Sequence, residues 1–278
     1  MPAPGTITPA PTVDYPAITA RHRAVWAAGN VARIGSLGTI HGELLCEALD
    51  IHPGERVLDT GAGNGAAAVA AARRWADVVA TDLVDHLLDS ARRIAETYGL
   101  SMRTQVADAQ DLPFEDDSFD IVMSAFGSMF APDQQAVADE AIRVCRPCGR
   151  IGLATWTPAS LMGDVFKVTA RRLPQTAGLH GATEWGTEER IRELFGNRIN
   201  SLRIATRTFT FRYRSPRHML EYFQTWDGPT QAAFEALDAD GQARLEADLL
   251  EVYATYNRAT DSTLVAPGEY LETVATVR

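Results

Sequence analysis

The feature that most constrains the fold is a glycine turn that directly follows a short apolar run. The stretch VLDTGAGNG, residues 57–65, brings Gly61 and Gly63 in just after the strand-like residues 56–59. Further strand-like runs occur at 78–82, 104–107, 119–125 and 150–156, with helical patterns such as 86–98 between them. Alternating strands and helices predict an α/β fold with a parallel sheet covered on both faces. In such a sheet a ligand binds where the carboxyl ends of the strands turn into helices.

The residues before this turn divide into a tail and two helical segments. Prolines separated by small residues predict a mobile tail at 1–16. A helical pattern follows around residues 18–32. A second helix precedes the first strand, and its apolar face is predicted to hold Ile40, Leu44, Leu45, Ala48 and Leu49.

Composition narrows the class of protein. The chain has 278 residues, and no apolar stretch approaches the roughly 20 residues that a membrane helix needs. The first residues lack the layout of a secretory signal and only three cysteines occur, so we expect a cytoplasmic protein without a disulfide framework. A net charge of −10 argues against nucleic acid as a partner.

The glycine turn fits two kinds of cofactor. Gly61, Gly63 and Ala66 match the dinucleotide-binding pattern G-x-G-x-x-G/A, and Asp82 follows where an acid binds ribose hydroxyls. Asp59 favours S-adenosylmethionine, because its carboxylate would repel a pyrophosphate on this turn. S-adenosylmethionine instead carries an ammonium group and a cationic sulfur.

The third strand-like run adds to this interpretation. Asp108, in VADAQDLPF, can accept a hydrogen bond from the exocyclic amine of adenine, and Leu83 can cover the face of the ring. Three carboxylates therefore follow or end three successive strands.

Residues 26–156 resemble the class I S-adenosylmethionine-dependent methyltransferases, in the small-molecule branch that includes ubiquinone and menaquinone biosynthesis enzymes. The matching segments, in order, are VLDTGAGNG, VVATDLV, VADAQDLPF, FDIVMSAFGSMFAPD and AIRVCRPCGRIGLATW. The resemblance implies a methyltransferase domain over residues 17–278, with a Rossmann-like, doubly wound sheet of seven strands, mostly parallel, whose last strand is antiparallel. We expect the two remaining strands near 202–213 and 264–277.

The resemblance also implies roles for particular residues. Asp59, Gly61 and Gly63 would hold the methionine end of the cofactor, and Asp82 would hold the ribose. Leu83, Asp108 and Ala109 would frame the adenine, and the backbone near Ser124 would face the ammonium group. The products would be S-adenosylhomocysteine and a methylated acceptor.

Cys148 departs from the family pattern, which usually has a glycine next to the position of Gly149. A side chain there puts the usual turn geometry in doubt. Cys145 and Cys148 form a C-x-x-C, but no second pair or nearby histidines complete a zinc site, so no metal site is predicted.

Two long segments, at about 157–186 and 215–261, exceed what short connections require and predict a helical cap. Ser215 with Pro216 predicts a helix start, and Asp238 or Asp240 predicts another. The residues predicted to line an acceptor chamber are Trp26, Phe126, Met129, Phe130, Trp156, His180, Trp185, His218, Tyr222 and Trp226.

The predicted function is methyl transfer from S-adenosylmethionine to a small apolar or aromatic acceptor. His180 and His218 are candidates for a base, but the sequence assigns no catalytic residue and leaves the methylated atom and the oligomeric state open. Two alternatives remain at this point, a nicotinamide-dependent oxidoreductase and a non-catalytic regulatory protein that binds S-adenosylmethionine.

Overall fold

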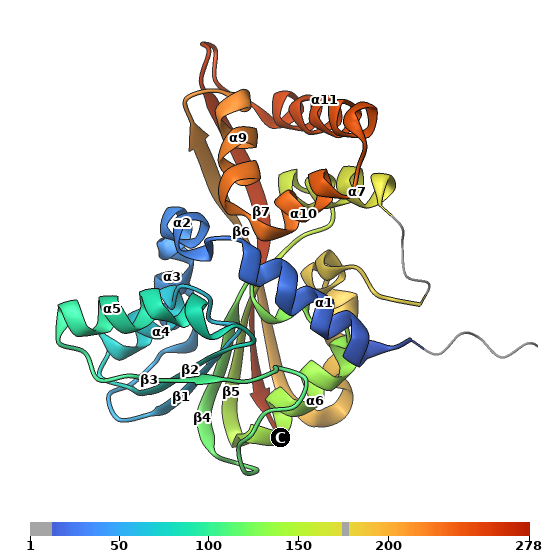
Figure 1. The fold of residues 1–278 in the computed structure, drawn as a ribbon. Helices are drawn as coiled ribbons and strands as arrows, with labels where there is room; N and C mark the ends of the chain where they lie inside the picture. Colours follow the sequence, from blue (N-terminus) through green and yellow to red (C-terminus); the bar gives the residue numbers. More distant parts are fainter. Residues whose placement is uncertain (1–12, 174–177) are drawn as a thin grey trace, which may run out of the picture.

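A seven-stranded sheet forms the centre of the computed structural model, which describes residues 13–173 and 178–278 (Figure 1). The strands, in chain order, are β1 (Arg56–Thr60), β2 (Asp77–Asp82), β3 (Arg103–Val106), β4 (Phe119–Ala125), β5 (Cys145–Trp156), β6 (Ile199–Tyr213) and β7 (Leu264–Val277). Their order across the sheet is β3-β2-β1-β4-β5-β7-β6. The first five strands pair in parallel, whereas β7 runs antiparallel to both β5 and β6. The predicted fold class is confirmed.

Helices cover both faces of this sheet (Figure 1). One face carries α3 (Thr39–Leu49), α4 (Ala66–Ala72) and α5 (Asp89–Tyr98), and the other carries α6 (Gln134–Val144) and α8 (Glu188–Phe195). The helix α4 reads AAAVAAA and is buried over nearly its whole length. Small residues let α3 come close, since a Cβ on Gly42 would lie 2.7 Å from the carbonyl oxygen of Ala66. This contact fixes α3 beside the glycine turn.

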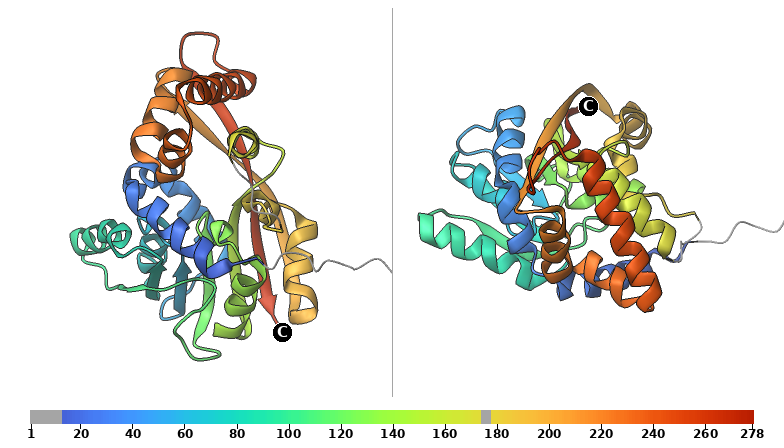
Figure 2. Two further views of the ribbon diagram at one scale, coloured as in Figure 1. Left: turned by 45° about the vertical axis from the view of Figure 1, so that its right-hand side comes forward. Right: turned by 90° about the horizontal axis from the view of Figure 1, so that it is seen from above.

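A group of helices lies beyond the carboxyl ends of β1, β4 and β5 (Figure 2). It contains α7 (Leu161–Arg172), α9 (Pro216–Trp226), α10 (Gly228–Glu235) and α11 (Ala239–Tyr256). The predicted helix starts at Ser215 and Asp238 are confirmed, because these side chains accept hydrogen bonds from the backbone N–H groups of His218 and Gly241. These helices occupy the segments predicted as a cap.

The helix α1 (Tyr15–Ala28) crosses the same end of the sheet (Figure 1). Beyond it the chain turns into α2 (Val31–Gly35), and the backbone N–H of Asn30 donates to the carbonyl of Trp226 at 2.7 Å. The single helix predicted around 18–32 is therefore two helices, since Gly29 is extended and Asn30 caps α2. Residues 1–12 of the predicted tail lie outside the described residues, and α1 begins at Tyr15, inside the predicted boundary.

The predicted apolar face of α3 is partly wrong. Ile40 and Leu44 are 53% and 37% exposed, whereas His41, Leu45 and Leu49 are buried. The close approach of Gly42 to α4 turns the helix about its axis, so a histidine takes the inward position near its start.

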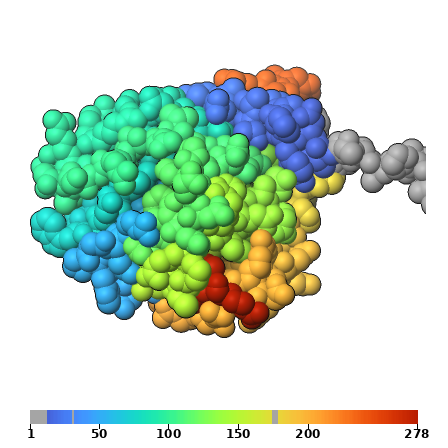
Figure 3. Space-filling model, turned by 90° about the horizontal axis from the view of Figure 1, so that it is seen from below, coloured from blue at the N-terminus to red at the C-terminus, as the bar shows by residue number. Residues whose placement is uncertain are grey.

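The opposite end of the molecule carries the C-terminus. Figure 3 shows the last residues of β7 (red) beside the starts of β5 (yellow-green) and β6 (orange). The strand register agrees, because Thr276 pairs with Arg150 and Val277 pairs with Ile199. Within residues 13–173 and 178–278, no helix has the length and apolar character required to cross a membrane.

Candidate active site

The turns after β1 and β4 meet at the point where the strand order reverses. Gly61 and Gly63 adopt left-handed backbone conformations, with φ of 62° and 53°. A Cβ on Gly61 would lie 2.9 Å from the backbone of Gly127, so only glycine permits this approach. Ligands of open α/β sheets bind at such a reversal point. The predicted cofactor turn therefore stands where the topology favours a ligand.

Asp82, the last residue of β2, joins the glycine turn directly. Its Oδ2 accepts from the backbone N–H of Gly63 at 2.9 Å, and its Oδ1 accepts from that of Val84 at 3.0 Å. Burial raises the pKa of this carboxyl, and these N–H donors oppose the rise. An ionised carboxylate has about four acceptor positions, so two donors leave room for ribose hydroxyls.

Asp59 lies deeper, in β1, and is 1% exposed. Neither carboxylate oxygen has a hydrogen-bond partner among the described residues. Burial raises the pKa of Asp59 to about 8, and the charge of Asp82 adds to the rise. A buried carboxyl without a partner is costly, and such groups gather at functional sites. A carboxyl in this position fits a ligand that carries a cationic group, such as the ammonium of S-adenosylmethionine.

Asp108 already has a partner. The side chain N–H₂ of Gln110 donates to both Asp108 oxygens at 2.9 and 3.0 Å and to the Thr19 hydroxyl of α1 at 3.0 Å. The Gln110 amide oxygen accepts from the backbone N–H of Asp133. The Gln110 amide therefore donates to the Asp108 oxygens that were predicted to accept the adenine amine. The sequence analysis did not identify Gln110. Leu83, predicted to cover the adenine, is half-buried directly after β2.

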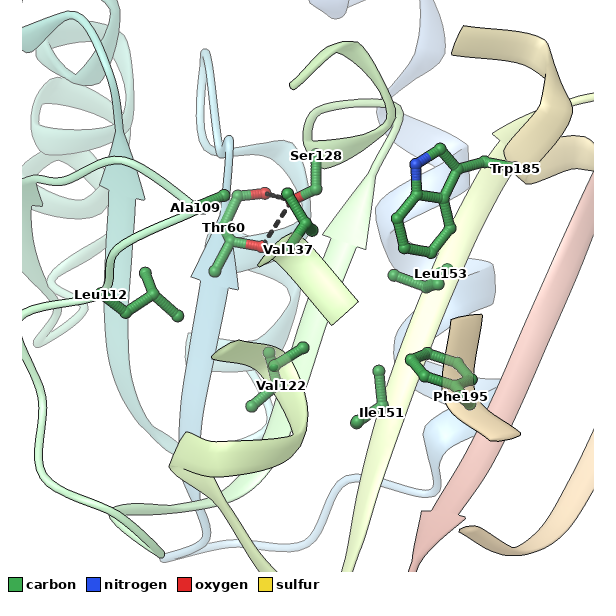
Figure 4. Close-up of a pocket in the computed structure, with 11 residues that line it drawn as sticks. Thr60, Ala109, Leu112, Val122, Ser128, Val137, Ile151, Leu153, Trp185 and Phe195 are labelled. Atoms are coloured by element: carbon green, nitrogen blue, oxygen red, sulfur yellow. Dashed lines mark hydrogen bonds between the residues drawn. The ribbon is translucent and has the colours of Figure 1, made fainter. Parts of the chain in front are cut away.

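Ser124 ties the ends of β1 and β4 together. Its hydroxyl donates to the carbonyl of Thr60 at 2.7 Å and accepts from the backbone N–H of Ser128 at 2.9 Å. The hydroxyls of Thr60 and Ser128 lie 2.7 Å apart, at the edge of a cavity of about 10 Å³ (Figure 4). Ala109 also lines this cavity, which has room for about one water molecule and not for an acceptor.

The predicted acceptor residues form separate groups. Phe126 and Trp156 stack at the ends of β4 and β5, with ring centroids 4.2 Å apart and planes at 18°. Trp26 of α1 meets Phe130 edge-on at 5.1 Å, in the short helix η3 (Ser128–Phe130). These two pairs border the reversal point.

A further group belongs to α9. His218 and Tyr222 contact the ring of Tyr213, and the Tyr222 hydroxyl donates to the carbonyl of Arg33 at 2.9 Å. The Arg33 guanidinium also lies 5.0 Å from the ring of Trp226. These side chains connect α9 to α2 and β6.

Three other predicted residues lie elsewhere. Met129 and Trp185 are each 2% exposed and pack into the core on the α6 face. His180 is about half-exposed and its Nδ1 lies 2.7 Å from a Glu184 oxygen. A hollow of about 460 Å³ lies between α7 and α11, and its lining includes none of the predicted site residues.

Sequence reasoning also missed His41. Its buried imidazole contacts the rings of both Phe126 and Trp156. The sequence does show a histidine directly before Gly42, which could have indicated a buried position. The predicted apolar face of α3 did not include it.

Cys148 keeps the turn geometry that its side chain put in doubt. Its φ is 62°, the left-handed conformation that favours the usual glycine, and the residue is exposed. Cys145 is buried. Within the ranges that the structure describes, no group of three or more metal-ligating side chains occurs.

Comparison with known proteins extends these observations. Residues 57–149 match a family model described as a methyltransferase domain. An uncharacterised protein of Mycobacterium tuberculosis is 38% identical over 255 residues, which cover 88% of this chain and 93% of the relative. Demethylmenaquinone methyltransferase from Clavibacter sepedonicus is 42% identical over 102 residues, 35% of this chain and 40% of the relative.

Among solved structures, the YcgJ protein of Bacillus subtilis matches with a TM-score of 0.60 at 20% identity, covering 86% of this chain and 98% of that one. This likeness shows the fold. The matched methyltransferase domain begins in β1, runs through the glycine turn and β4 and ends in β5, so it contains the carboxyl ends of β1 and β4, between which the strand order reverses. The chain belongs to the class I S-adenosylmethionine-dependent methyltransferases.

Proposed function

We propose that this methyltransferase acts on a small acceptor with a planar, apolar body. The observation that carries the proposal is the stacked pair Phe126 and Trp156 beside the glycine turn. Flat aromatic surfaces favour flat apolar ligands, because stacking adds to the burial of apolar area. One relative is named for demethylmenaquinone, which agrees with this class of acceptor.

The residues around the turn would hold the cofactor, which supplies a methyl group on a cationic sulfur. Asp82 would accept the ribose hydroxyls, and Asp59, which its raised pKa keeps protonated in the free protein, would ionise beside the ammonium group and balance its charge. Asp108 would accept the adenine amine once Gln110 turns away. The backbone near Ser124, with Gly61 and Gly63, would complete the methionine side.

The helix α1 would close the site. It is tied to the strand ends by the Thr19–Gln110 hydrogen bond and by the Trp26–Phe130 ring contact. Methyl transfer needs an aligned nucleophile and the exclusion of water, and a helix across the strand ends serves both needs.

Isothermal titration with S-adenosylhomocysteine tests the cofactor residues. The variant Asp82→Asn keeps an acceptor oxygen for the turn but loses the charge, and we expect it to bind roughly tenfold more weakly or worse. Asp77→Asn is the matched control, because Asp77 lies at the other end of β2 and is exposed. Equal binding by wild type and Asp82→Asn would remove Asp82 from the site.

A second experiment tests the acceptor class. Protein supplied with S-adenosylmethionine carrying a labelled methyl group is incubated with planar phenols, quinols and aromatic amines, and in parallel with aliphatic alcohols and amines. We expect label transfer to the planar set. Transfer to the aliphatic set alone would refute the proposed acceptor.

A further inference from the structure

An imidazole lies inside a box of aromatic rings at the carboxyl end of the sheet. His41 of α3 is 6% exposed. Four rings surround it, with centroid distances of 4.7 Å to Phe126, 5.8 Å to Trp156, 4.6 Å to Phe209 and 5.0 Å to Tyr270. We call His41 and these four rings the aromatic box.

One nitrogen of this imidazole has a partner and the other has none. Nδ1 lies 2.8 Å from the carbonyl oxygen of Gly38. A carbonyl can only accept, so Nδ1 carries the proton and Nε2 carries the lone pair. Nε2 is fully buried and has no hydrogen-bond partner in the described structure. Burial lowers the pKa of His41 to about 4, so the ring is neutral at neutral pH.

A second polar atom of the aromatic box is also buried without a hydrogen-bond partner among the described residues. The Tyr270 hydroxyl is buried without a partner among the described residues, and Tyr270 is 2% exposed. A buried polar group that is left unpaired lowers the stability of the fold, because it has lost its hydrogen bonds to water. Two such groups in one apolar enclosure mark a place where a ligand would supply the missing hydrogen bonds.

The box borders the cofactor turn. Gly42, the next residue after His41, packs against the backbone of Ala66 at the start of α4. On the other side, Phe126 directly precedes Gly127, whose backbone packs against Gly61. The imidazole is thus held between the two turns that flank the reversal point, where the cofactor is expected.

We propose that Nε2 of His41 accepts the hydroxyl proton of a phenolic acceptor during methyl transfer. This inference rests on the proposed function and specifies its substrate class. The acceptor must bring a donor, because Nε2 presents only a lone pair. Phe126 and Phe209 are the half-buried rings of the box, so one of them would have to turn aside for the acceptor to reach Nε2.

The step balances in atoms and charge. The phenol oxygen forms a bond to the methyl carbon, and the bond from that carbon to sulfur breaks with its electron pair remaining on sulfur. The phenolic proton moves to Nε2, so the positive charge passes from sulfur to the imidazole. The imidazolium then releases this proton to solvent after the ether leaves. His41 acts as a general base, and the Tyr270 hydroxyl offers the acceptor a second hydrogen bond.

The test uses 2-naphthol and its methyl ether, 2-methoxynaphthalene, as probes. Each is titrated into protein loaded with S-adenosylhomocysteine, for wild type, His41→Phe and His52→Phe. His52 is an exposed histidine outside the box and is the matched control. We expect wild type and His52→Phe to bind 2-naphthol about tenfold more tightly than the ether, because only the alcohol donates to Nε2. We expect no such preference in His41→Phe.

A second variant separates binding from proton transfer. His41→Gln can present an amide oxygen toward the acceptor but cannot take up its proton. With S-adenosylmethionine and 2-naphthol, we expect its turnover to fall at least about a hundredfold while its affinity for 2-naphthol stays near that of wild type. This variant also keeps the test decisive if His41→Phe does not fold.

The proposed function and the role of His41 fail in different experiments. If wild-type protein does not bind S-adenosylhomocysteine, the proposed function is refuted. With that ligand bound, three results would overturn the role of His41: no binding of 2-naphthol, equal binding of alcohol and ether, or a preference that survives in His41→Phe. Wild-type protein that binds but does not methylate 2-naphthol, or unchanged turnover in His41→Gln, would overturn the role as base.

Discussion

Acid should destabilise the protein through His41, and the size of the effect follows from its burial. The ordinary pKa of histidine is 6.5, and burial lowers that of His41 to about 4. A group whose pKa is depressed in the folded state binds protons more readily when unfolded, so stability falls as pH decreases below 6.5. In the unfolded chain at pH 5, the protonated form of His41 outnumbers the neutral form by about 30 to 1. In the folded protein the neutral form still dominates at this pH. This difference is worth about 2 kcal/mol.

Urea unfolding at pH 8 and pH 5, followed by tryptophan fluorescence, measures this effect. Other groups also titrate over this range, so the quantity that counts is the difference between wild type and His41→Phe. We expect wild type to lose about 2 kcal/mol more than the variant between the two pH values, with unchanged dependence on urea concentration. Equal losses would show that folded His41 takes up a proton at pH 5, and the conclusion that burial lowers its pKa would then be refuted.

Three further predictions concern the turns and Asp59. Cys148→Gly should raise the free energy of unfolding by about 1 kcal/mol, because Cys148 has a left-handed backbone conformation that costs about this much for any residue with a Cβ. Cys148→Ala keeps the Cβ and should leave the free energy of unfolding unchanged in the same urea assay. Gly65→Ala should destabilise the protein by about 1–3 kcal/mol more than Gly54→Ala. Both glycines have positive φ, but only at Gly65 would a Cβ overlap another atom, at 2.3 Å from the Cβ of Ala91, so similar melting temperatures would contradict the packing. Asp59→Asn should gain stability relative to wild type as pH rises from 5 to 8, because the raised pKa of Asp59 makes the folded wild type lose stability over that range, and a constant difference would refute its burial as an acid.

The sheet and the glycine turn could be predicted because each rests on local pattern. The run 119–125 is observed as β4 with the same bounds, and the run 78–82 differs from β2 by one residue. The start of β5 was missed by five residues, since the segment around Cys148 bends before it joins the sheet in regular register. Helix starts at Ser215 and Asp238 were predictable because a capping side chain acts within its own turn.

Contacts between distant segments could not be predicted in the same way. Gln110 is only two residues from Asp108, but it is held there by Thr19, 91 residues away, and by Asp133, so its position depends on contacts that are distant in the sequence. The predicted aromatic residues were chosen by type, but their grouping depends on how α1, α9 and the end of β5 pack. Side-chain type indicates what a residue can bind, and packing decides where it does so.

The burial of His41 depends on both the local helix pattern and the packing of distant segments. Periodicity treats a histidine as polar, and for α3 the predicted apolar face was partly wrong, since Ile40 and Leu44 are exposed and His41 is buried. The helix instead turns inward on Gly42 and buries an imidazole that gains one hydrogen bond and leaves one nitrogen unpaired. A stable core would favour an apolar residue at this position, because the unpaired nitrogen lowers stability without improving the packing. Departures from local rules that carry a cost are expected at functional sites. The residue at which the helix pattern fails is therefore the one at which a catalytic role has the strongest physical argument.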